Sequence, residues 1–144
     1  MNQSSFASQK IKVYRFNWAY RLYHFGVGAA AIVGAVLCRE FMVLAIGLTL
    51  FSVFMIARPL VMAVIVDQSS VTFKGMFSTD SLERSSITAV QTQHTGKGDI
   101  LILWGNIDEK ENLAIPDLFG FDDDWDDWWS TYRDLSDDKP ISLF

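Results

Sequence analysis

Two long apolar runs separated by two charged residues dominate the first part of the chain. The first run extends from Leu22 to Cys38 and the second from Phe41 to Ala57, with Arg39 and Glu40 between them. Neither run contains Asp, Glu, Lys or Arg, and a helix of either length would be about 25 Å long, close to the hydrocarbon thickness of a bilayer. The pattern predicts an antiparallel transmembrane hairpin over residues 22–58, because a backbone in lipid must satisfy its hydrogen bonds within helices. The aromatic residues Trp18, Tyr20 and Tyr23, around the start of the first run, would extend the first helix into the membrane interface.

Three other interpretations compete with the membrane hairpin. A cleaved signal peptide fits the small residues Ala29, Ala30 and Ala31, but it does not explain a second apolar run directly behind the first. A lipoprotein signal requires a small residue before Cys38, where the chain has Leu37. A buried helical hairpin of a soluble protein would keep a polar stripe, which neither run shows.

Basic residues flank the outer ends of the predicted hairpin. Lys10, Lys12, Arg15 and Arg21 precede it and Arg58 follows it, whereas Arg39 is the one cation at the tip. The positive-inside rule therefore predicts that both termini are cytoplasmic, with residues 1–21 as a basic N-terminal segment. We expect Cys38, near the outer tip, to serve as a small apolar residue and not as a reactive thiol.

Small residues recur along one side of the first run, at Gly26, Ala30 and Gly34. This spacing lets a second helix approach closely. The partner is expected to be the second helix of the same chain, although a second copy or a different membrane protein fits the same pattern.

After Arg58 and Pro59 the hydrophobic period changes from helical to alternating. Short runs rich in β-branched residues are separated by turn-forming residues, which is typical of strands joined by tight turns. The run over residues 100–104 is apolar on both faces, which predicts a central strand. The predicted strands are Leu60–Val66, Val71–Lys74, Met76–Leu82, Ile87–Gln93, Ile100–Trp104 and Leu113–Ile115.

Helical spacing returns in the last stretch, from about Asp117 to Leu135. Large apolar residues recur there every three or four positions and share one helix face. The acidic residues 122–124 fall in the first turn, where the helix dipole favours carboxylates. An α+β fold follows, in which a C-terminal amphipathic helix closes a small antiparallel sheet. The apolar face consists of Phe121, Trp125, Trp128, Trp129, Tyr132 and Leu135.

The segment from Leu60 to Leu135 resembles the bacterial pleckstrin-homology-like (PH-like) domains that follow a two-span hairpin in small membrane proteins. This resemblance implies a seven-stranded, barrel-like sandwich capped by the C-terminal helix and used for binding and scaffolding. It places the domain at residues 59–136, with a tail at 137–144, and the protein in a bacterial inner membrane. The matching features are Arg58-Pro59, the hairpin around Val66-Asp67 and Val71-Thr72-Phe73, the run Ser86-Ile87-Thr88-Ala89-Val90, Gly98 before Ile100–Leu103, Ile115-Pro116, and the helix Phe121–Leu135.

Charge is divided unequally along the 144 residues, whose net value is −5. Residues 1–58 carry +5 and residues 59–144 carry −10. The acidic part is unsuited to neutralising phosphates, which argues against nucleic-acid binding. Its cations Lys74, Arg84, Lys97 and Lys110 are scattered among acids, so we expect no binding of anionic lipid head groups. A single cysteine, Cys38, excludes an intramolecular disulfide and a multi-thiolate metal site.

Candidate chemistry is sparse in this sequence. His24 lies near the cytoplasmic end of the first run, where an interfacial ring is typical. His94 precedes a Gly-Lys turn that lacks the remaining residues of a phosphate-binding loop. The acidic run 122–127 lacks the glycine turn and distal glutamate of a calcium loop. We therefore expect no catalytic residue, no cofactor and no metal, and we predict that the protein is not an enzyme.

The acidic aromatic helix is the main candidate for partner binding, through Trp125, Asp126, Trp128 and Trp129. The same tryptophans can instead cap the core, because each buries a large apolar area. Anionic lipid would repel their acidic neighbours, so a contact with another protein is favoured over a contact with lipid.

These observations predict a small integral membrane protein whose cytoplasmic PH-like domain binds or scaffolds another protein or a further copy of itself. Two other functions remain open. One is an inhibitor or immunity-type membrane protein that acts through its hairpin, and the other is an accessory subunit of a larger membrane complex.

Overall fold

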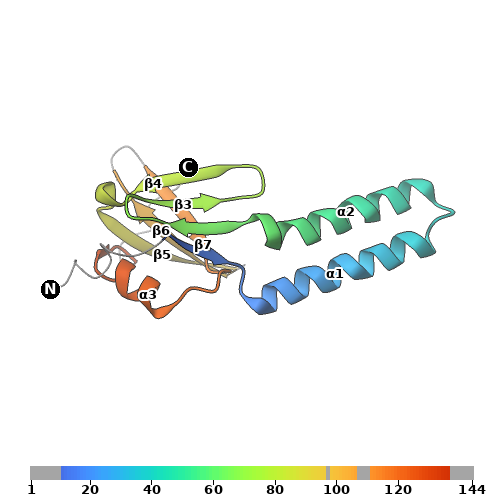
Figure 1. Cartoon of the computed structure of the whole chain (residues 1–144), viewed down its shortest axis with the longest axis horizontal. Helices are drawn as coiled ribbons and strands as arrows, with labels where there is room; N and C mark the ends of the chain where they lie inside the picture. Colours follow the sequence, from blue (N-terminus) through green and yellow to red (C-terminus); the bar gives the residue numbers. More distant parts are fainter. Residues whose placement is uncertain (1–10, 97, 107–110, 137–144) are drawn as a thin grey trace.

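Two apolar helices form an antiparallel hairpin that projects from one end of a β-sheet domain (Figure 1). The computed structural model describes residues 11–96, 98–106 and 111–136. Helix α1 spans Trp18–Leu37 and helix α2 spans Met42–Val61. Both helices are long and apolar enough to cross a membrane. The two helices expected from the sequence are thus present, each extended at its domain end.

The extension of α2 shortens the strand that was expected to start at Leu60. The backbone N–H of Met62 donates to the carbonyl of Arg58 at 3.1 Å, so the last helical turn continues past Pro59. Pro59 has no N–H to donate to the carbonyl of Met55, so one helical hydrogen bond is lost there without ending the helix. Strand β2 therefore begins at Ala63.

Close packing of α1 against α2 centres on Gly28. The Ser52 hydroxyl donates to the carbonyl oxygen of Gly28 at 2.8 Å across the interface. A Cβ atom at Gly28 would lie 2.6 Å from Cγ1 of Ile56, so a larger residue would force the Ile56 side chain or a helix to move. His24 and Ala31, one turn away on either side, are also buried.

The strands form two four-stranded sheets. Their orders are β1-β2-β3-β4 and β7-β6-β5-β8, and each neighbouring pair is antiparallel except β5 and β8. A short 3₁₀ helix, η1, over Arg84–Ser86 joins the sheets. The strand bounds are β1 Lys12–Arg15, β2 Ala63–Val66, β3 Ser70–Lys74, β4 Thr79–Glu83, β5 Ala89–Thr95, β6 Gly98–Trp104, β7 Asn112–Pro116 and β8 Arg133–Asp134.

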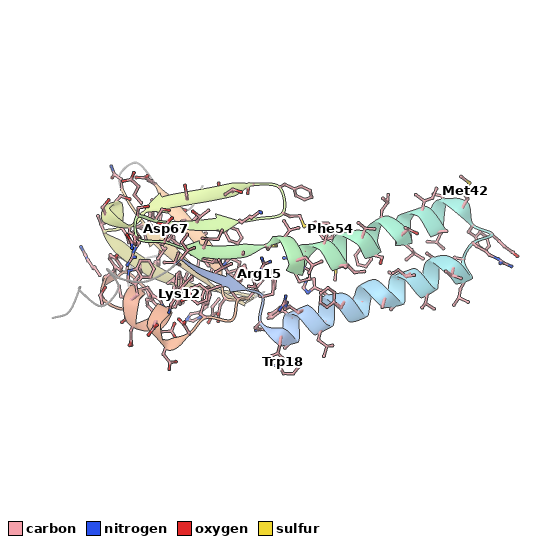
Figure 2. The ribbon with its side chains drawn as sticks, in the orientation of Figure 1. Lys12, Arg15, Trp18, Met42, Phe54 and Asp67 are labelled. Carbon is pink, nitrogen blue, oxygen red and sulfur yellow. The ribbon has the colours of Figure 1, made fainter. Side chains whose placement is uncertain are left out.

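Strand β1, which the sequence analysis did not anticipate, precedes the helical hairpin and pairs with the strand that follows it. Lys12 lies opposite Val66 and Arg15 lies opposite Ala63. The helices are therefore an insertion between two neighbouring strands of one sheet. Arg15 strengthens this junction because its guanidinium donates to the carbonyl of Leu60, in the last turn of α2, at 2.7 Å (Figure 2).

The main core lies between the two sheets and under the short helix α3, Asp123–Trp129. Among the described residues the sheets do not close into a barrel. The α+β layout expected from the sequence is confirmed in this coarser form. The buried residues of this core are Tyr14, Phe16, Met62, Val64, Val66, Val71, Leu82, Ile87, Val90, Leu103, Leu113, Ile115, Phe119, Trp125 and Trp128.

Helix α3 is much shorter than the helix expected up to Leu135. The hydroxyls of Ser130 and Thr131 donate to the carbonyls of Asp127 and Trp128 at 2.9 and 2.7 Å. Such side-chain bonds compete with the helical backbone pattern. The chain then enters β8, and the N–H of Leu135 donates to the carbonyl of Val90 at 2.8 Å. Leu135 consequently packs in a second cluster with Ala89, Ile102 and Trp104.

The turn between β2 and β3 is fixed by the carboxylate of Asp67. Its Oδ1 accepts the backbone N–H groups of Ser69 and Ser70, both at 2.7 Å. The bond from Ser70, followed by those from Ser69, lowers the pKa of Asp67 to about 2. The turn expected at Asp67–Ser70 is confirmed, and it sets the register of the hairpin.

Candidate functional site

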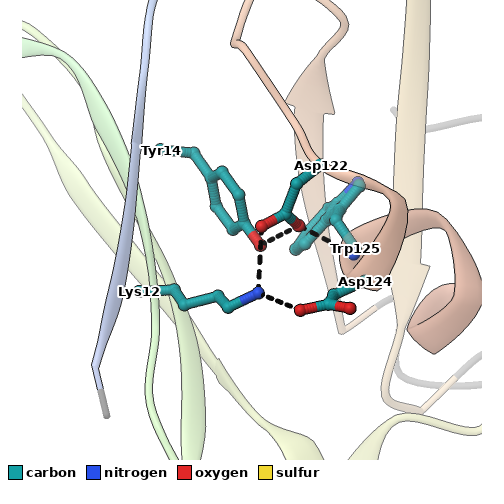
Figure 3. Close-up of polar contacts among 5 residues, drawn as sticks. All are labelled: Lys12, Tyr14, Asp122, Asp124 and Trp125. Atoms are coloured by element: carbon teal, nitrogen blue, oxygen red, sulfur yellow. Dashed lines mark hydrogen bonds and ion pairs between the residues drawn. The ribbon is translucent and has the colours of Figure 1, made fainter. Parts of the chain in front are cut away.

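Helix α3 begins at an aspartate that binds three groups at once. Asp122 is the N-cap, and its Oδ1 accepts the backbone N–H of Trp125 at 3.1 Å. The same oxygen accepts the hydroxyl of Tyr14 at 2.7 Å, while Oδ2 accepts the ammonium of Lys12 at 2.9 Å (Figure 3). Lys12 also donates to Asp124 at 2.6 Å. This clasp, comprising Lys12, Tyr14, Asp122 and Asp124, joins strand β1 to α3.

The clasp changes the protonation equilibria of its members. The hydrogen bond to Asp124, followed by that to Asp122, raises the pKa of Lys12 well above its ordinary value. Burial, and then the bond to Asp122, raises the pKa of Tyr14. Partial burial opposes ionisation of Asp122, but the bonds from Lys12, Tyr14 and Trp125 outweigh it and lower its pKa. At neutral pH the stable form of the clasp therefore holds a charged Lys12, an ionised Asp122 and a neutral Tyr14 hydroxyl.

Replacing Asp122 with alanine is expected to lower the free energy of unfolding by about 1–2 kcal/mol, the usual value of an N-cap. Because the pKa of Asp122 is lower in the folded state, its contribution is present above the ordinary pKa of 3.8 and is lost as the pH falls below that value. Urea unfolding at pH 7 and at pH 2.5 measures both effects. Asp123→Ala, an exposed neighbour, is the matched control. Equal effects of the two variants at pH 7 would contradict the role of the clasp.

Two of the tryptophans proposed for partner binding belong to the core. Trp125 is 2% exposed and Trp128 is 6% exposed. Trp125 stacks on Phe121 with ring centroids 4.5 Å apart. The guanidinium of Arg84 lies 5.1 Å from the centre of the Trp128 ring, within the range of a cation–π interaction. Direct contact of either ring with a partner would require the core to open.

Asp126 lies instead on the exposed side of α3, and Trp129 lies at the edge of the core. Asp126 is exposed and Trp129 is half-buried, and the indole N–H of Trp129 donates to Oδ1 of Asp126 at 3.1 Å. With the exposed residues Asp123 and Asp127, these two form a surface that we call the acidic face of α3. Of the four candidates on this helix, the structure thus leaves Asp126 and Trp129 accessible.

The three small residues proposed for helix packing do not share one environment. Gly34 is half-buried, and a Cβ atom there would lie 3.4 Å from Cδ1 of Leu48 on α2. Gly26 and Ala30 are exposed, and nothing lies within 4 Å of the Cβ position of Gly26. The contact within the hairpin uses Gly28 instead, so Gly26 and Ala30 face away from α2.

Both histidines and the cysteine have identifiable surroundings. His24 is buried at the domain end of α1, where its Nδ1 lies 2.7 Å from the carbonyl oxygen of Tyr20 and its ring lies 5.7 Å from that of Phe16. His94 is exposed beside Asp99, with Nδ1 2.7 Å from Oδ1. Cys38 caps the end of α1 as a free thiol.

Among the residues that the structure describes, no three His, Cys, Asp or Glu side chains come together as a metal site. Lys97 and Lys110, two of the scattered cations, lie outside the described residues, as do residues 1–10 of the basic segment and the tail 137–144.

Sequence reasoning missed Lys12 and Tyr14 as parts of this site. The sequence signal is confined to Tyr14, Arg15 and Phe16, which alternate apolar, basic and apolar, and the structure buries Tyr14 and Phe16 and exposes Arg15. Alternation of this kind is typical of a strand with one buried face. It was overlooked because the strand's partner comes only after both helices.

Comparison with known proteins adds no relative to this description: no family model, no curated protein and no solved structure matches the chain.

Proposed function

We propose that the protein is an integral membrane protein whose α1–α2 hairpin spans a bilayer. The exposure of the helices carries this proposal, because only 11% of the apolar stretch of α1 and 17% of that of α2 is buried. Apolar side chains point outward all around the hairpin, including Phe54 and Met42 on α2 (Figure 2). A core helix of a soluble protein would bury one side, whereas lipid accepts every side.

The charges at the two ends of the hairpin give its proposed orientation. Arg15, Arg21 and Arg58 lie at the domain end, whereas Arg39 and Glu40 offset each other at the tip. The positive-inside rule then places the domain, with both termini, in the cytoplasm, and a bacterial inner membrane accommodates this arrangement.

We further propose that the domain is a PH-like module that binds or scaffolds another protein and performs no catalysis. Two facing sheets closed by a helix support this interpretation, since such a frame presents surfaces on rigid elements. The acidic face of α3 is the proposed docking surface. Asp123, Asp126 and Asp127 project from a helix held by two buried tryptophans and the clasp, so a basic partner would meet a preorganised array of carboxylates.

A photo-crosslinking residue in place of Asp126 tests the docking surface in the full-length protein, in membranes of the cell that makes it. We expect a discrete crosslinked partner from this position and none from Ser81, an exposed control position on β4. Reversing charge with Asp127→Lys should reduce the crosslinked product by about tenfold if one buried pair is lost. Equal labelling from positions 126 and 81 would refute the docking surface.

A second function, inhibition or immunity through the hairpin, is favoured by one observation. Gly26 and Ala30 form a small, exposed patch on the side of α1 that α2 does not cover. Small residues let a foreign helix approach closely in lipid. Loss of the biological activity in a Gly26→Leu, Ala30→Leu double variant whose domain remains folded would support this function, and loss on Asp126→Lys would support the domain.

A further inference from the structure

The turn between β3 and β4 carries an aromatic side chain in an unusual place. Residues Gly75–Ser78 make this turn, which closes with a hydrogen bond from the N–H of Gly75 to the carbonyl of Ser78 at 2.8 Å. Phe77 is 90% exposed at its tip, and Met76 beside it is half-buried. Turns usually hold Gly, Asn, Asp, Ser or Pro for backbone reasons. A large exposed ring here contributes nothing to the described core and is suited to an external contact.

Strand register places this turn beside the domain end of α2. Lys74, the last residue of β3, lies opposite Ala63, the first residue of β2. The tip of the turn therefore extends about two residues, or roughly 7 Å, past Ala63 in the direction of the helix. At ~1.5 Å per helical residue this distance corresponds to about five residues of α2, which is the level of Arg58. Figure 1 shows the β3–β4 turn pointing in the same direction as the α1–α2 hairpin and lying beside the domain end of α2.

Other side chains at this level are typical of a membrane interface. Trp18 is 77% exposed at the domain end of α1, and Arg58 lies in the last turn of α2 (Figure 2). Tryptophan and arginine collect where the hydrocarbon ends. Phe77 therefore occupies the same layer as the residues that bound the proposed span.

Charges in the β3–β4 hairpin nearly cancel. Lys74 and Asp80 are both exposed, and Oδ2 of Asp80 accepts the hydroxyl of Ser78 at 3.2 Å. A contact made by this turn would therefore depend on its apolar side chains and not on lipid charge. This conclusion agrees with the expectation that the domain does not recognise anionic head groups.

We propose that Met76 and Phe77 insert into the interfacial layer of the bilayer that holds α1 and α2, as a third membrane contact. The proposal rests on the hairpin spanning a membrane, and it deepens that function by fixing how the domain sits on the surface. The ligand is a phospholipid surface of either zwitterionic or anionic composition. Together with the two helix ends, the turn defines a plane, so the acidic face of α3 is held at a set angle to the membrane.

Lipid quenching of a fluorophore in the full-length protein tests this insertion. A Cys38→Ser background removes the native thiol, and single cysteines at Ser78, Gln68 and Leu50 carry a nitrobenzoxadiazole label. Ser78 is exposed beside Phe77, Gln68 is exposed at the opposite end of the β2–β3 pair, and Leu50 is exposed near the middle of α2. The proteins are reconstituted in phosphatidylcholine vesicles with and without shallow-brominated phosphatidylcholine.

We expect quenching at positions 50 and 78 and none at position 68. Phe77→Asp should abolish quenching at position 78 and leave that at position 50 unchanged, because Phe77 supports no described core residue. Quenching at 50 with none at 78 would overturn the inserted turn alone. Absence of quenching at position 50 would overturn the membrane-spanning function, and the inserted turn with it.

Discussion

Replacing Trp125 with alanine is expected to remove a large part of the stability of the β domain. The indole is 2% exposed and packs among the rings of Phe121, Tyr14 and Trp128, whose centroids lie 4.5, 5.6 and 5.3 Å away. Truncating a buried aromatic residue to alanine costs about 3–5 kcal/mol, since the lost burial adds to the cavity left behind. That cost is a large part of the stability of an ordinary domain, which is roughly 5–15 kcal/mol.

Near-ultraviolet circular dichroism during urea unfolding of the full chain in detergent measures this loss. Trp129→Ala is the matched control on the same helix, because Trp129 is half-buried at the edge of the core, and we expect it to cost about 1 kcal/mol. Helical far-ultraviolet signal from α1 and α2 should survive in both variants. A Trp125→Ala domain as stable as the Trp129→Ala domain would contradict the assignment of Trp125 to the core.

Gly28→Leu is expected to separate the two helices. Even a Cβ atom at this position would come within 2.6 Å of Cγ1 of Ile56, and a whole leucine would also break the bond from Ser52 to the Gly28 carbonyl. Overpacking of this kind costs about 1–3 kcal/mol. Because the helices connect β1 to β2, their separation should also loosen that strand pair, so we expect the melting temperature of the detergent-solubilised protein to fall by about 5–10 °C.

Gly26→Leu is the matched control for this substitution. It makes the same chemical change two residues earlier on the same helix, where nothing lies within 4 Å. Leucine has a higher helix propensity than glycine, so we expect this variant to be as stable as the parent or slightly more so. A fall in melting temperature for Gly26→Leu equal to that for Gly28→Leu would indicate that α1 packs through another face.

The helices and most of the strands were predictable because their signals are local. Uncharged runs of seventeen residues on either side of Arg39 and Glu40 define a hairpin without knowledge of anything else in the chain. The turn at Asp67–Ser70 was equally readable, since an aspartate followed by serines forms its own hydrogen bonds. The predicted ends of the elements were less accurate than the elements themselves, as the continuation of α2 through Pro59 shows.

The candidate site was only partly readable from the sequence. Helical spacing grouped Trp125, Trp128 and Trp129 on one side of the acidic helix, but it did not distinguish rings that fill the core from one that lies at its edge. That distinction depends on where the two sheets meet α3. Spacing likewise grouped Gly26 with Gly34, although a neighbouring helix approaches Gly34 and leaves Gly26 uncovered.

The sequence by itself determined two apolar helices, a β-rich segment and an acidic helix start, because periodicity, turn residues and charge act over a few neighbouring positions. Only the tertiary structure decided that Lys12–Arg15 forms a strand, that Lys12 reaches Asp122 and Asp124, and that Leu135 leaves the helix for the second cluster. These contacts join residues more than thirty positions apart. The pairing of β1 with β2 is possible because the antiparallel helices bring Ala63 back beside Arg15, so the two strands satisfy each other's backbone hydrogen-bonding groups.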